Sequence, residues 1–320
     1  MPLFVSAPSS PFEPPSLIYH FLSSPLNCLA HYAYAVILFL RGPAYHPPVA
    51  AIRIVCLSDT HTKTPSSVPW GDVLIHAGDL ANAGTVSEIQ AQIDWIASLP
   101  HREKIVVAGN HDSFFDPSSR AASDAGKSID WAGVHYLQHS SITLAFLDHN
   151  NRQLSVYGAP GIPQCGGDEF AFQYQRHDDQ WTGKIPRDID VLVTHTPPRY
   201  HLDLPAGMGC DHLLNEVWRV RPRAHIFGHV HAGYGRESVF WDEGQAAYER
   251  IRARDNAGLL WDLVSVSAWI DALRMLWCGL VGILWTQVWG GVDDGGVMVN
   301  ASLAYRSTGK LGNAPQIVDI

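Results

Sequence analysis

The sequence predicts an α/β fold in which several buried parallel strands deliver their carboxyl ends to one place. Short apolar runs, rich in β-branched residues, alternate with segments long enough for helices, and this alternation is typical of parallel sheets. The runs are 52–57, 73–77, 105–108, 191–194 and 224–227. A polar cluster follows each run directly. Because functional side chains in open α/β sheets collect at the carboxyl ends of the strands, we expect one domain with one composite site.

The segments between these runs have recognisable boundaries. Thr85 and Glu88 have the spacing of a capping box, and apolar residues recur at helical period until Pro100, which predicts a helix. A second helix is expected around 213–217. Residues 142–157 contain two strand-like runs on either side of a turn-rich stretch, which predicts a hairpin and, with it, a second sheet.

The polar clusters carry three Asp or Asn side chains and four imidazoles. In chain order the motifs are D-T-H, G-D, G-N-H-D, a single histidine and G-H-V-H. The candidate metal ligands are Asp59, His61, Asp79, Asn110, His195, His229 and His231. Imidazole together with carboxylate suits Zn, Fe or Mn better than Ca, which prefers all-oxygen sites. A shared ligand must offer two oxygens, as Asp79 does, so the set predicts two divalent metal ions with one bridging carboxylate.

Such a pair of ions has a definite chemistry. Two ions roughly 3.5–4 Å apart clamp the attacking and leaving oxygens of an in-line displacement at phosphorus. They also lower the pKa of a bound water enough to supply hydroxide near neutral pH. Each motif alone is a weak signal, but the ordered set, each member after a strand-like run, is a strong one.

These motifs resemble those of the calcineurin-like metallophosphoesterase superfamily, and the similarity is greatest to its metallophosphoesterase-domain-containing (MPPED) branch. Residues 75–79, 193–198 and 221–229 are among the supporting stretches. The resemblance covers roughly residues 51–250 and 296–320. It implies two packed mixed β-sheets flanked by helices, a four-layer α/β/β/α sandwich.

The resemblance also implies roles for individual residues. One metal ion would be held by Asp59, His61, Asp79 and His231. The other would be held by Asp79, Asn110, His195 and His229. His111 would be the catalytic histidine that is not a ligand and protonates the leaving oxygen. Protein-phosphatase relatives orient that histidine with an Asp where this chain has Asn82, so Asn82, Asp112 or no residue performs this function here.

Composition limits the partners and the compartment. The net charge of −9 argues against a nucleic-acid polymer as the main partner, because phosphate-backbone binding needs Lys and Arg. The five cysteines are odd in number and lack C-x-x-C spacing, which indicates reduced thiols. We therefore expect an intracellular protein, either cytoplasmic or membrane-associated.

Residues 1–50 form a leader outside the motif-bearing domain. No charged residue occurs from Pro14 to Leu40, and a helix is expected from Pro25 to Leu40. Its sixteen residues would extend about 24 Å, which is short of a ~30 Å hydrocarbon core. A membrane anchor, a packed or interfacial helix and a disordered leader all remain open.

Residues 251–295 form a hydrophobic, tryptophan-rich insertion. It contains five of the eleven tryptophans: Trp261, Trp269, Trp277, Trp285 and Trp289. Its glycines shorten the expected helix to about 15 residues, too short to span a bilayer comfortably. Tryptophan at both ends of the insertion favours contact with a membrane interface through 261–289. The apolar run 25–40 of the leader is the other candidate for a membrane contact. Packing on the flank of the domain is the alternative.

The leading functional hypothesis is a binuclear metal-dependent phosphoesterase that hydrolyses a small-molecule phosphodiester or phosphomonoester. The MPPED resemblance implies 3′,5′-cyclic nucleotides as candidate substrates. Asn82, and Arg199 and His201 in the loop after His195, are candidate substrate contacts, although such loop residues are more often simply solvated. A protein phosphatase is one alternative. A catalytically silent, membrane-associated interaction protein is another, but retention of His111 and all seven ligands speaks against it.

Overall fold

A computed structural model describes residues 7–254 and 258–320 of the chain. Residues 1–6 of the leader and 255–257 of the insertion lie outside the described residues. The helices are α1 (Leu17–Ser23), α2 (Pro25–Arg41), α3 (Val86–Ser98), α4 (Asp211–Val220), α5 (Glu243–Arg252), α6 (Leu259–Val264) and α7 (Val266–Gln287). The strands are β1 (Arg53–Leu57), β2 (Val73–Ala77), β3 (Glu103–Val107), β4 (His135–Tyr136), β5 (Ser140–Phe146), β6 (Arg152–Ala159), β7 (Ile162–Pro163), β8 (Gln173–Tyr174), β9 (Val191–Thr194), β10 (Ala224–Phe227), β11 (Gly235–Val239), β12 (Gly296–Asn300) and β13 (Gln316–Asp319).

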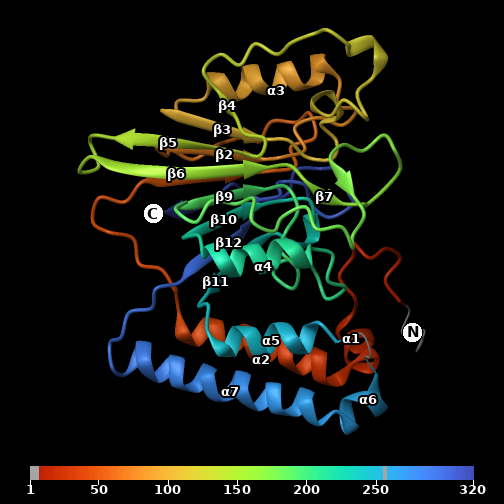
Figure 1. The fold of residues 1–320 in the computed structure, drawn as a ribbon, viewed down its shortest axis with the longest axis vertical. Helices are drawn as coiled ribbons and strands as arrows, with labels where there is room; N and C mark the ends of the chain where they lie inside the picture. Colours follow the sequence, from red (N-terminus) through yellow and green to blue (C-terminus); the bar gives the residue numbers. More distant parts are fainter. Residues whose placement is uncertain (1–6, 255–257) are drawn as a thin grey trace.

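Two mixed sheets pack face to face, which confirms the predicted fold class (Figure 1). The first has the strand order β13-β1-β2-β3-β4, and only β13 runs antiparallel to its neighbour. The second has the order β11-β12-β10-β9-β6-β5, with parallel strands in the middle and antiparallel strands at both edges. The sandwich therefore brings β1, β2, β3, β9 and β10, the five predicted strands, to its centre.

Alternating side chains of each central strand face two different apolar layers. In β1, Ile54 and Cys56 point into the core between the sheets, whereas Val55 and Leu57 pack beneath α3. The outer face of the second sheet is covered by α4, through residues such as Leu213. Because both faces of each sheet are buried, the strands carry continuous apolar runs, and this is the signal that identified them in the sequence.

Several predicted local elements are confirmed. Thr85 is the N-cap of α3 and accepts a hydrogen bond from the Glu88 amide. Ser24 caps α2, which begins at Pro25 as expected and ends at Arg41. The hairpin is formed by β5 and β6, which pair antiparallel from Ser140 to Phe146.

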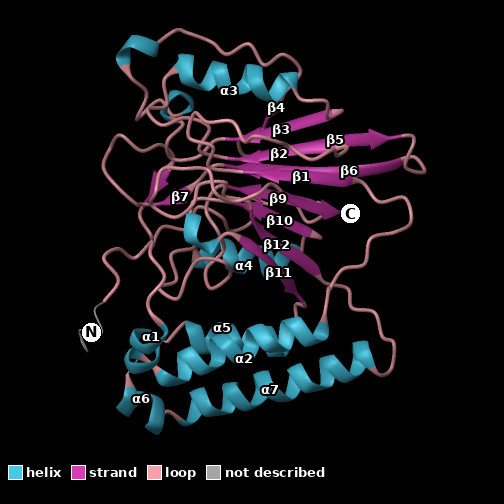
Figure 2. Cartoon of the chain, turned by 180° about the vertical axis from the view of Figure 1, so that it is seen from behind, coloured by secondary structure: helices cyan, strands magenta, loops and turns pink. Residues whose placement is uncertain are grey.

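A helical layer formed by α2, α5 and α7 covers the end of the molecule opposite α3 (Figure 1, Figure 2). The leader and the insertion therefore meet in space although more than 200 residues separate them. The Arg41 guanidinium of the leader pairs with Asp293 of the insertion at 3.0 Å, and with Asp242, just before α5, at 2.5 Å. The Ser24 hydroxyl and the Leu26 amide both donate to Asp262, each at 2.9 Å.

The expected helix of about 15 residues in the insertion is wrong in length, because α7 has 22 residues. Gly279 and Gly282 were expected to shorten it, but they lie inside the helix on its packed face. A Cβ at Gly279 would lie 2.6 Å from Ile37, and one at Gly282 would lie 2.6 Å from the Arg41 Nε. The glycines allow α2 and α7 to approach closely, and tertiary packing outweighs their low helix propensity.

His201 fastens α5 to the sandwich. Its ring is fully buried between two carboxylates, with Nδ1 2.9 Å from Glu237 on β11 and Nε2 2.9 Å from Glu249 on α5. The sequence hypothesis of a phosphate contact at His201 is wrong, because both ring nitrogens are engaged away from solvent. Burial lowers the pKa of His201, but the two carboxylates outweigh burial and raise that pKa to about 10.

Replacing His201 with glutamine is expected to destabilise the chain by about 3–5 kcal/mol, because Glu249, which is buried, and Glu237, which is partly buried, lose their cation. Since the folded-state pKa is raised, the stabilisation by His201 is fully present below pH 6.5 and is lost as pH rises through about 10. Denaturant unfolding of the two proteins from pH 6 to pH 10.5 checks this. A difference in unfolding free energy that does not shrink at high pH would show that the imidazolium charge plays no part.

Candidate metal centre

The predicted ligands lie on loops that leave the carboxyl ends of the central strands, and several of those loops are strained. Asp59, His61, Asp79 and His229 have φ values of 54°, 46°, 56° and 64°. Positive φ is uncommon outside glycine, and such strain clusters where the surrounding structure imposes a functional geometry. Four of the seven predicted ligands therefore have a backbone conformation that is uncommon outside glycine, although Asp and His adopt it more readily than most residues.

Glycines in the motifs permit the close approach of these loops. A Cβ at Gly109 would collide with the Asp79 carboxylate, and one at Gly228 would collide with Ser58 and Asp59. The glycines of G-N-H-D and G-H-V-H are thus explained by crowding around the two buried carboxylates.

The first predicted metal site combines ligands from the first motif, D-T-H, with a ligand from the last, G-H-V-H. Ligand atoms of Asp59, His61 and His231 all lie within 4.8 Å of one another. His231 Nδ1 is 2.9 Å from the Arg306 carbonyl, so it carries the proton and leaves Nε2 facing the site. Nε2 of His61 and Nε2 of His231 are 3.3 Å apart, close enough for one to donate to the other or for both to bind one cation.

The second predicted site lies beside the first, with Asp79 between them. The Asp79 Oδ2 is 3.4 Å from His195 Nε2 and 3.8 Å from His61 Nε2. His195 Nδ1 donates to the Ala77 carbonyl at 2.9 Å, so its Nε2 faces the site, 3.0 Å from the Asn110 Oδ1. The ring of His229 lies against that of His195, with 5.2 Å between centroids. Asp79 thus has the central place that a bridging ligand requires.

The charge balance of the cluster fits divalent cations. Asp59 and Asp79 are almost completely buried, and their counter-charges within the described residues are imidazoles. Burial lowers the pKa values of His195 and His231, but the two carboxylates outweigh it and raise each pKa to about 9. Burial lowers the pKa of His229 to about 3, which leaves a neutral ring able to ligate. Two carboxylates with converging imidazole nitrogens suit Zn, Fe or Mn.

His111 lies at the edge of this cluster and is oriented by a backbone group. Its Nδ1 donates to the Asn82 carbonyl oxygen at 2.8 Å, and its amide donates to the Asp79 Oδ1 at 2.9 Å. A ring nitrogen of His111 also lies within 4.8 Å of ligand atoms of His61 and Asp79. The Asp112 carboxylate accepts instead from the amides of Gly109, Leu80 and Ala81. Asp112 therefore ties two motif loops together and does not touch the His111 ring.

Replacing Asn82 with alanine is expected to leave turnover within about threefold of the wild type, because the backbone carbonyl that holds His111 remains. The lost side-chain bonds run to the His61 carbonyl and the Thr62 hydroxyl, not to the His111 ring. Steady-state kinetics measure the effect. A loss as large as that in a His111 variant would show that the Asn82 side chain orients the histidine.

Two cavities border the cluster, and their linings include residues that the sequence hypothesis missed. One, of about 220 Å³, is lined by His61, Asn82, His111 and His231 together with the cations Lys63, Arg306 and Lys310. The other, of about 380 Å³, is lined by His229, Arg176 and Phe12 of the leader, whose ring lies 5.6 Å from that of His229. Lys63 follows the D-T-H motif by two residues and could have been suspected, whereas Arg306 and Phe12 carry no sequence signal.

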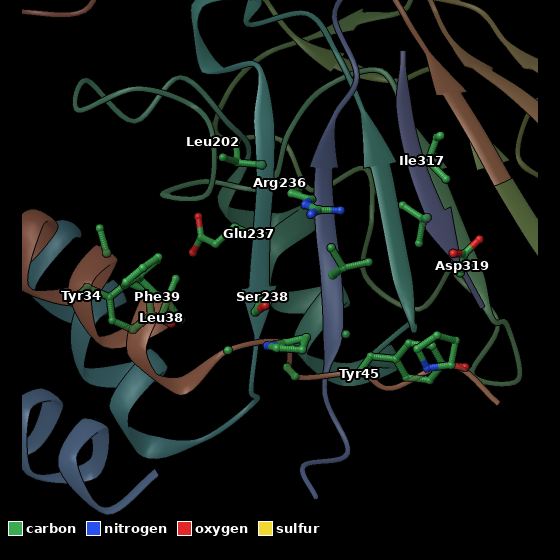
Figure 3. Close-up of a pocket in the computed structure, with 18 of the residues that line it drawn as sticks. Tyr34, Leu38, Phe39, Tyr45, Leu202, Arg236, Glu237, Ser238, Ile317 and Asp319 are labelled. Carbon is green, nitrogen blue, oxygen red and sulfur yellow. The ribbon is translucent and has the colours of Figure 1, made fainter. Parts of the chain in front are cut away.

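Two other features lie away from the metal cluster. Arg199 pairs with Asp211 at 2.5 Å and does not line either of these cavities, so the structure does not place it among the site residues. A larger cavity, of about 730 Å³, lies between α2 and β11 and contains none of the predicted ligands (Figure 3). Cavity size therefore does not identify the reactive centre here, whereas ligand geometry does.

A sandwich of two mixed sheets with Asp and His side chains gathered at the strand ends is the architecture of a metallophosphoesterase. The chain belongs to the calcineurin-like phosphoesterase family, whose sequence profile matches residues 52–233. The resemblance inferred from the motifs is thereby confirmed.

Curated relatives support this assignment. Metallophosphoesterase domain-containing protein 1 of Homo sapiens is 39% identical over 208 residues, covering 59% of this chain and 63% of that protein. The UPF0046 protein C25E10.12 of Caenorhabditis elegans is 37% identical over 198 residues, or 58% of this chain and 70% of that protein. A protein of Emericella nidulans named probable rhamnogalacturonate lyase C is 42% identical over 264 residues, which are 80% of this chain but 24% of that protein. The chain thus spans less than two thirds of the first and third of these relatives.

Proposed function

We propose that the chain is a binuclear metal-dependent phosphoesterase that hydrolyses a small-molecule phosphodiester or phosphomonoester. The observation that carries the proposal is the convergence of two buried carboxylates and several imidazoles on strained loops, with His111 at their edge. Positive φ at four of the seven predicted ligands supports the proposal, because such backbone conformations cluster at functional sites.

The side chains of this protein have distinct tasks in the proposed reaction. Asp59, Asp79, Asn110 and the four predicted ligand histidines would hold two divalent ions, Mn, Fe or Zn. When bound, such ions supply positive charge to the phosphoryl oxygens and lower the pKa of a bound water. The Ala77 and Arg306 carbonyls fix the tautomers of His195 and His231, so that Nε2 of each ring faces the centre.

His111 is proposed to donate a proton to the leaving oxygen. Its Nδ1 is held by the Asn82 carbonyl, so Nε2 is the nitrogen left to exchange a proton with substrate. The ring is also braced by Phe170, 4.9 Å away in an edge-to-face arrangement. A positioned general acid of this kind typically contributes about 10²–10⁴-fold to a rate.

The surroundings favour a small anionic substrate. Of the two bordering cavities, the one of about 380 Å³ is at the lower end of the range for small-molecule sites, and the one of about 220 Å³ is below it. Lys63, Arg306 and Lys310 line one of them in a chain whose net charge is −9. These cations would attract a phosphate, and Phe12 in the other cavity offers a ring on which a nucleobase could stack. A cyclic nucleotide meets both requirements.

The cysteines favour an intracellular location. All five are free thiols in the structure, and Cys28, Cys56 and Cys210 are buried. Unpaired thiols are typical of proteins made in a reducing compartment.

The proposal is tested by assaying the full chain, stripped with chelator and reloaded with Mn, Fe or Zn. Substrates are bis(p-nitrophenyl) phosphate, p-nitrophenyl phosphate and 3′,5′-cyclic AMP. Hydrolysis that disappears on chelation and returns on reloading supports a metal-dependent esterase. Stoichiometric metal binding without turnover of any of these esters would favour the catalytically silent alternative.

A further inference from the structure

The outer flank of α7 is a stripe of exposed apolar side chains that contains one charged residue, Arg274. The stripe follows the helical period and comprises Val266, Trp269, Ile270, Leu273, Leu276, Trp277, Leu280, Val281, Trp285 and Val288. In the folded molecule α7 is the outermost element at its end of the structure (Figure 1, Figure 2). A contiguous apolar surface of this extent is rare on a soluble monomer and marks a contact with something outside the chain.

The neighbouring helices enlarge this surface. In α6, the side chains of Leu260, Trp261 and Leu263 are exposed, and in α1 those of Ile18 and Leu22 are exposed. Both short helices lie at the same end of α7 (Figure 2). Trp261 and Trp269 therefore lie near one end of the surface, and Trp285 and Trp289 near the other.

Two aspartates of the insertion are turned inward. Asp271 pairs with Arg250 of α5 at 2.8 Å, and Asp262 accepts from Ser24 and from the Leu26 amide of the leader. Arg274, the one charged residue of α7 besides Asp271, pairs with Asp271 at 3.3 Å, but its side chain is 54% exposed. The Trp269 indole donates to the Asp262 carbonyl at 2.9 Å. The outer flank of α7 therefore offers a partner one charged side chain, Arg274, among its apolar residues.

The opposite flank of α7 packs against the rest of the protein. Among the described residues, α7 is the one helix long and apolar enough to cross a membrane, but Ala268, Ala272 and Met275 are buried against α5 and α2. At 1.5 Å per residue it is about 33 Å long and lies along the helical layer. If α7 crossed a bilayer, it would leave the other helices. The close contact of Gly282 with Arg41 and the ion pair between Asp271 and Arg250 would then be lost.

We propose that this surface, formed by the outer flank of α7 with α6 and α1, binds a lipid bilayer in the plane of its interface, without spanning it. Protein interfaces carry about one hydrogen bond per 100–200 Å² and a polar rim, whereas this flank exposes a single charged side chain, Arg274, among apolar ones. Tryptophans at both ends of an apolar helix are characteristic of the headgroup region. Because the one charged side chain of the flank, Arg274, is paired with Asp271, we expect attachment to be hydrophobic, insensitive to salt and independent of anionic lipid.

The test is flotation of the full chain with phosphatidylcholine vesicles, with and without phosphatidylserine, at 0.1 and 1 M salt. The variant L273Q/W277Q changes two side chains that are each 66% exposed. The matched control, W70Q/L147Q, changes a tryptophan and a leucine outside the helical layer that are 65% and 73% exposed. The wild type and the control are expected to float at both salt concentrations, and the α7 variant to partition at least about tenfold less.

A second measurement does not depend on the variant. Brominated phosphatidylcholine is expected to quench part of the wild-type tryptophan fluorescence, because Trp269, Trp277 and Trp285 would contact the acyl region. Absence of flotation by the wild type, or equal loss in both variants, would overturn the proposal. So would salt-sensitive binding that requires phosphatidylserine. Lipid-free self-association that L273Q/W277Q abolishes, with no flotation of the wild type, would identify a second copy as the occupant. None of these readouts depends on hydrolysis.

Discussion

Replacing Asp79 with asparagine is expected to cost the protein both metal ions rather than one. Its carboxylate lies between the two predicted sites, 3.4 Å from His195 and 3.8 Å from His61, and the change removes a buried negative charge shared by both. Metal content should fall from about two ions per chain toward zero or one. Turnover should fall at least about a hundredfold, since even residues behind the ligands contribute 10–100-fold to affinity or activity.

Asp72→Asn is the matched control for Asp79→Asn. Asp72 is also a buried aspartate near the first sheet, but it accepts from the Arg53 amide and lies at the opposite ends of the strands. Its variant should keep both ions. Elemental analysis of the purified proteins measures the difference, and a fully active Asp79→Asn protein with two ions would show that the bimetal assignment is wrong.

Replacing His111 with alanine or asparagine is expected to leave the metal content unchanged and to lower turnover. The loss should reach about 10²–10⁴-fold for substrates with poor leaving groups, which need a proton. It should be smallest for nitrophenyl esters, because nitrophenolate leaves without protonation. Comparing kcat for alkyl and nitrophenyl esters of the same phosphate checks the dependence on the leaving group.

The outcome separates two roles for His111. Equal losses on good and poor leaving groups would show that the imidazole only stabilises charge on the phosphoryl group. A loss of one metal ion would show that His111 is a ligand. This is geometrically possible, because a ring nitrogen of His111 lies within 4.8 Å of ligand atoms of His61 and Asp79.

The sequence was sufficient where the signal is local or periodic. Strands such as β2 and β9 are buried on both faces, so they appear as unbroken apolar runs, and their ends mark the site. The starts of helices could also be predicted from the sequence. Thr85 and Ser24 are N-caps, and their side chains accept hydrogen bonds from amides in the first turn of the helix that each begins. The order of the motifs therefore predicted both the sheets and the assembly of the candidate ligands.

Contacts made by the backbone could not be predicted in this way. The orienting group of His111 is the carbonyl of Asn82, and a carbonyl is present at every residue, so no residue type marks it. Likewise, the Asp112 carboxylate accepts hydrogen bonds from three backbone amides. From its position in G-N-H-D, Asp112 was as good a candidate as Asn82 for orienting His111.

Long-range packing was the other limit. Nothing in the composition of the leader or of the insertion shows that Ile37 packs on Gly279 or that Arg41 packs on Gly282. These contacts stabilise α7 over its full 22 residues, which is longer than its glycines suggested. They also bury one flank of a helix whose apolar residues lie on all sides. His201 is a similar case, because its two carboxylate partners are 36 and 48 residues away.

The most direct test of the central claim is a crystal structure of the metal-loaded protein with anomalous differences measured at the absorption edge of the bound metal. Two peaks are expected, roughly 3.5–4 Å apart. They should lie on either side of the Asp79 carboxylate, one against Asp59, His61 and His231 and the other against Asn110, His195 and His229. A single peak, or peaks elsewhere in the molecule, would contradict the binuclear centre.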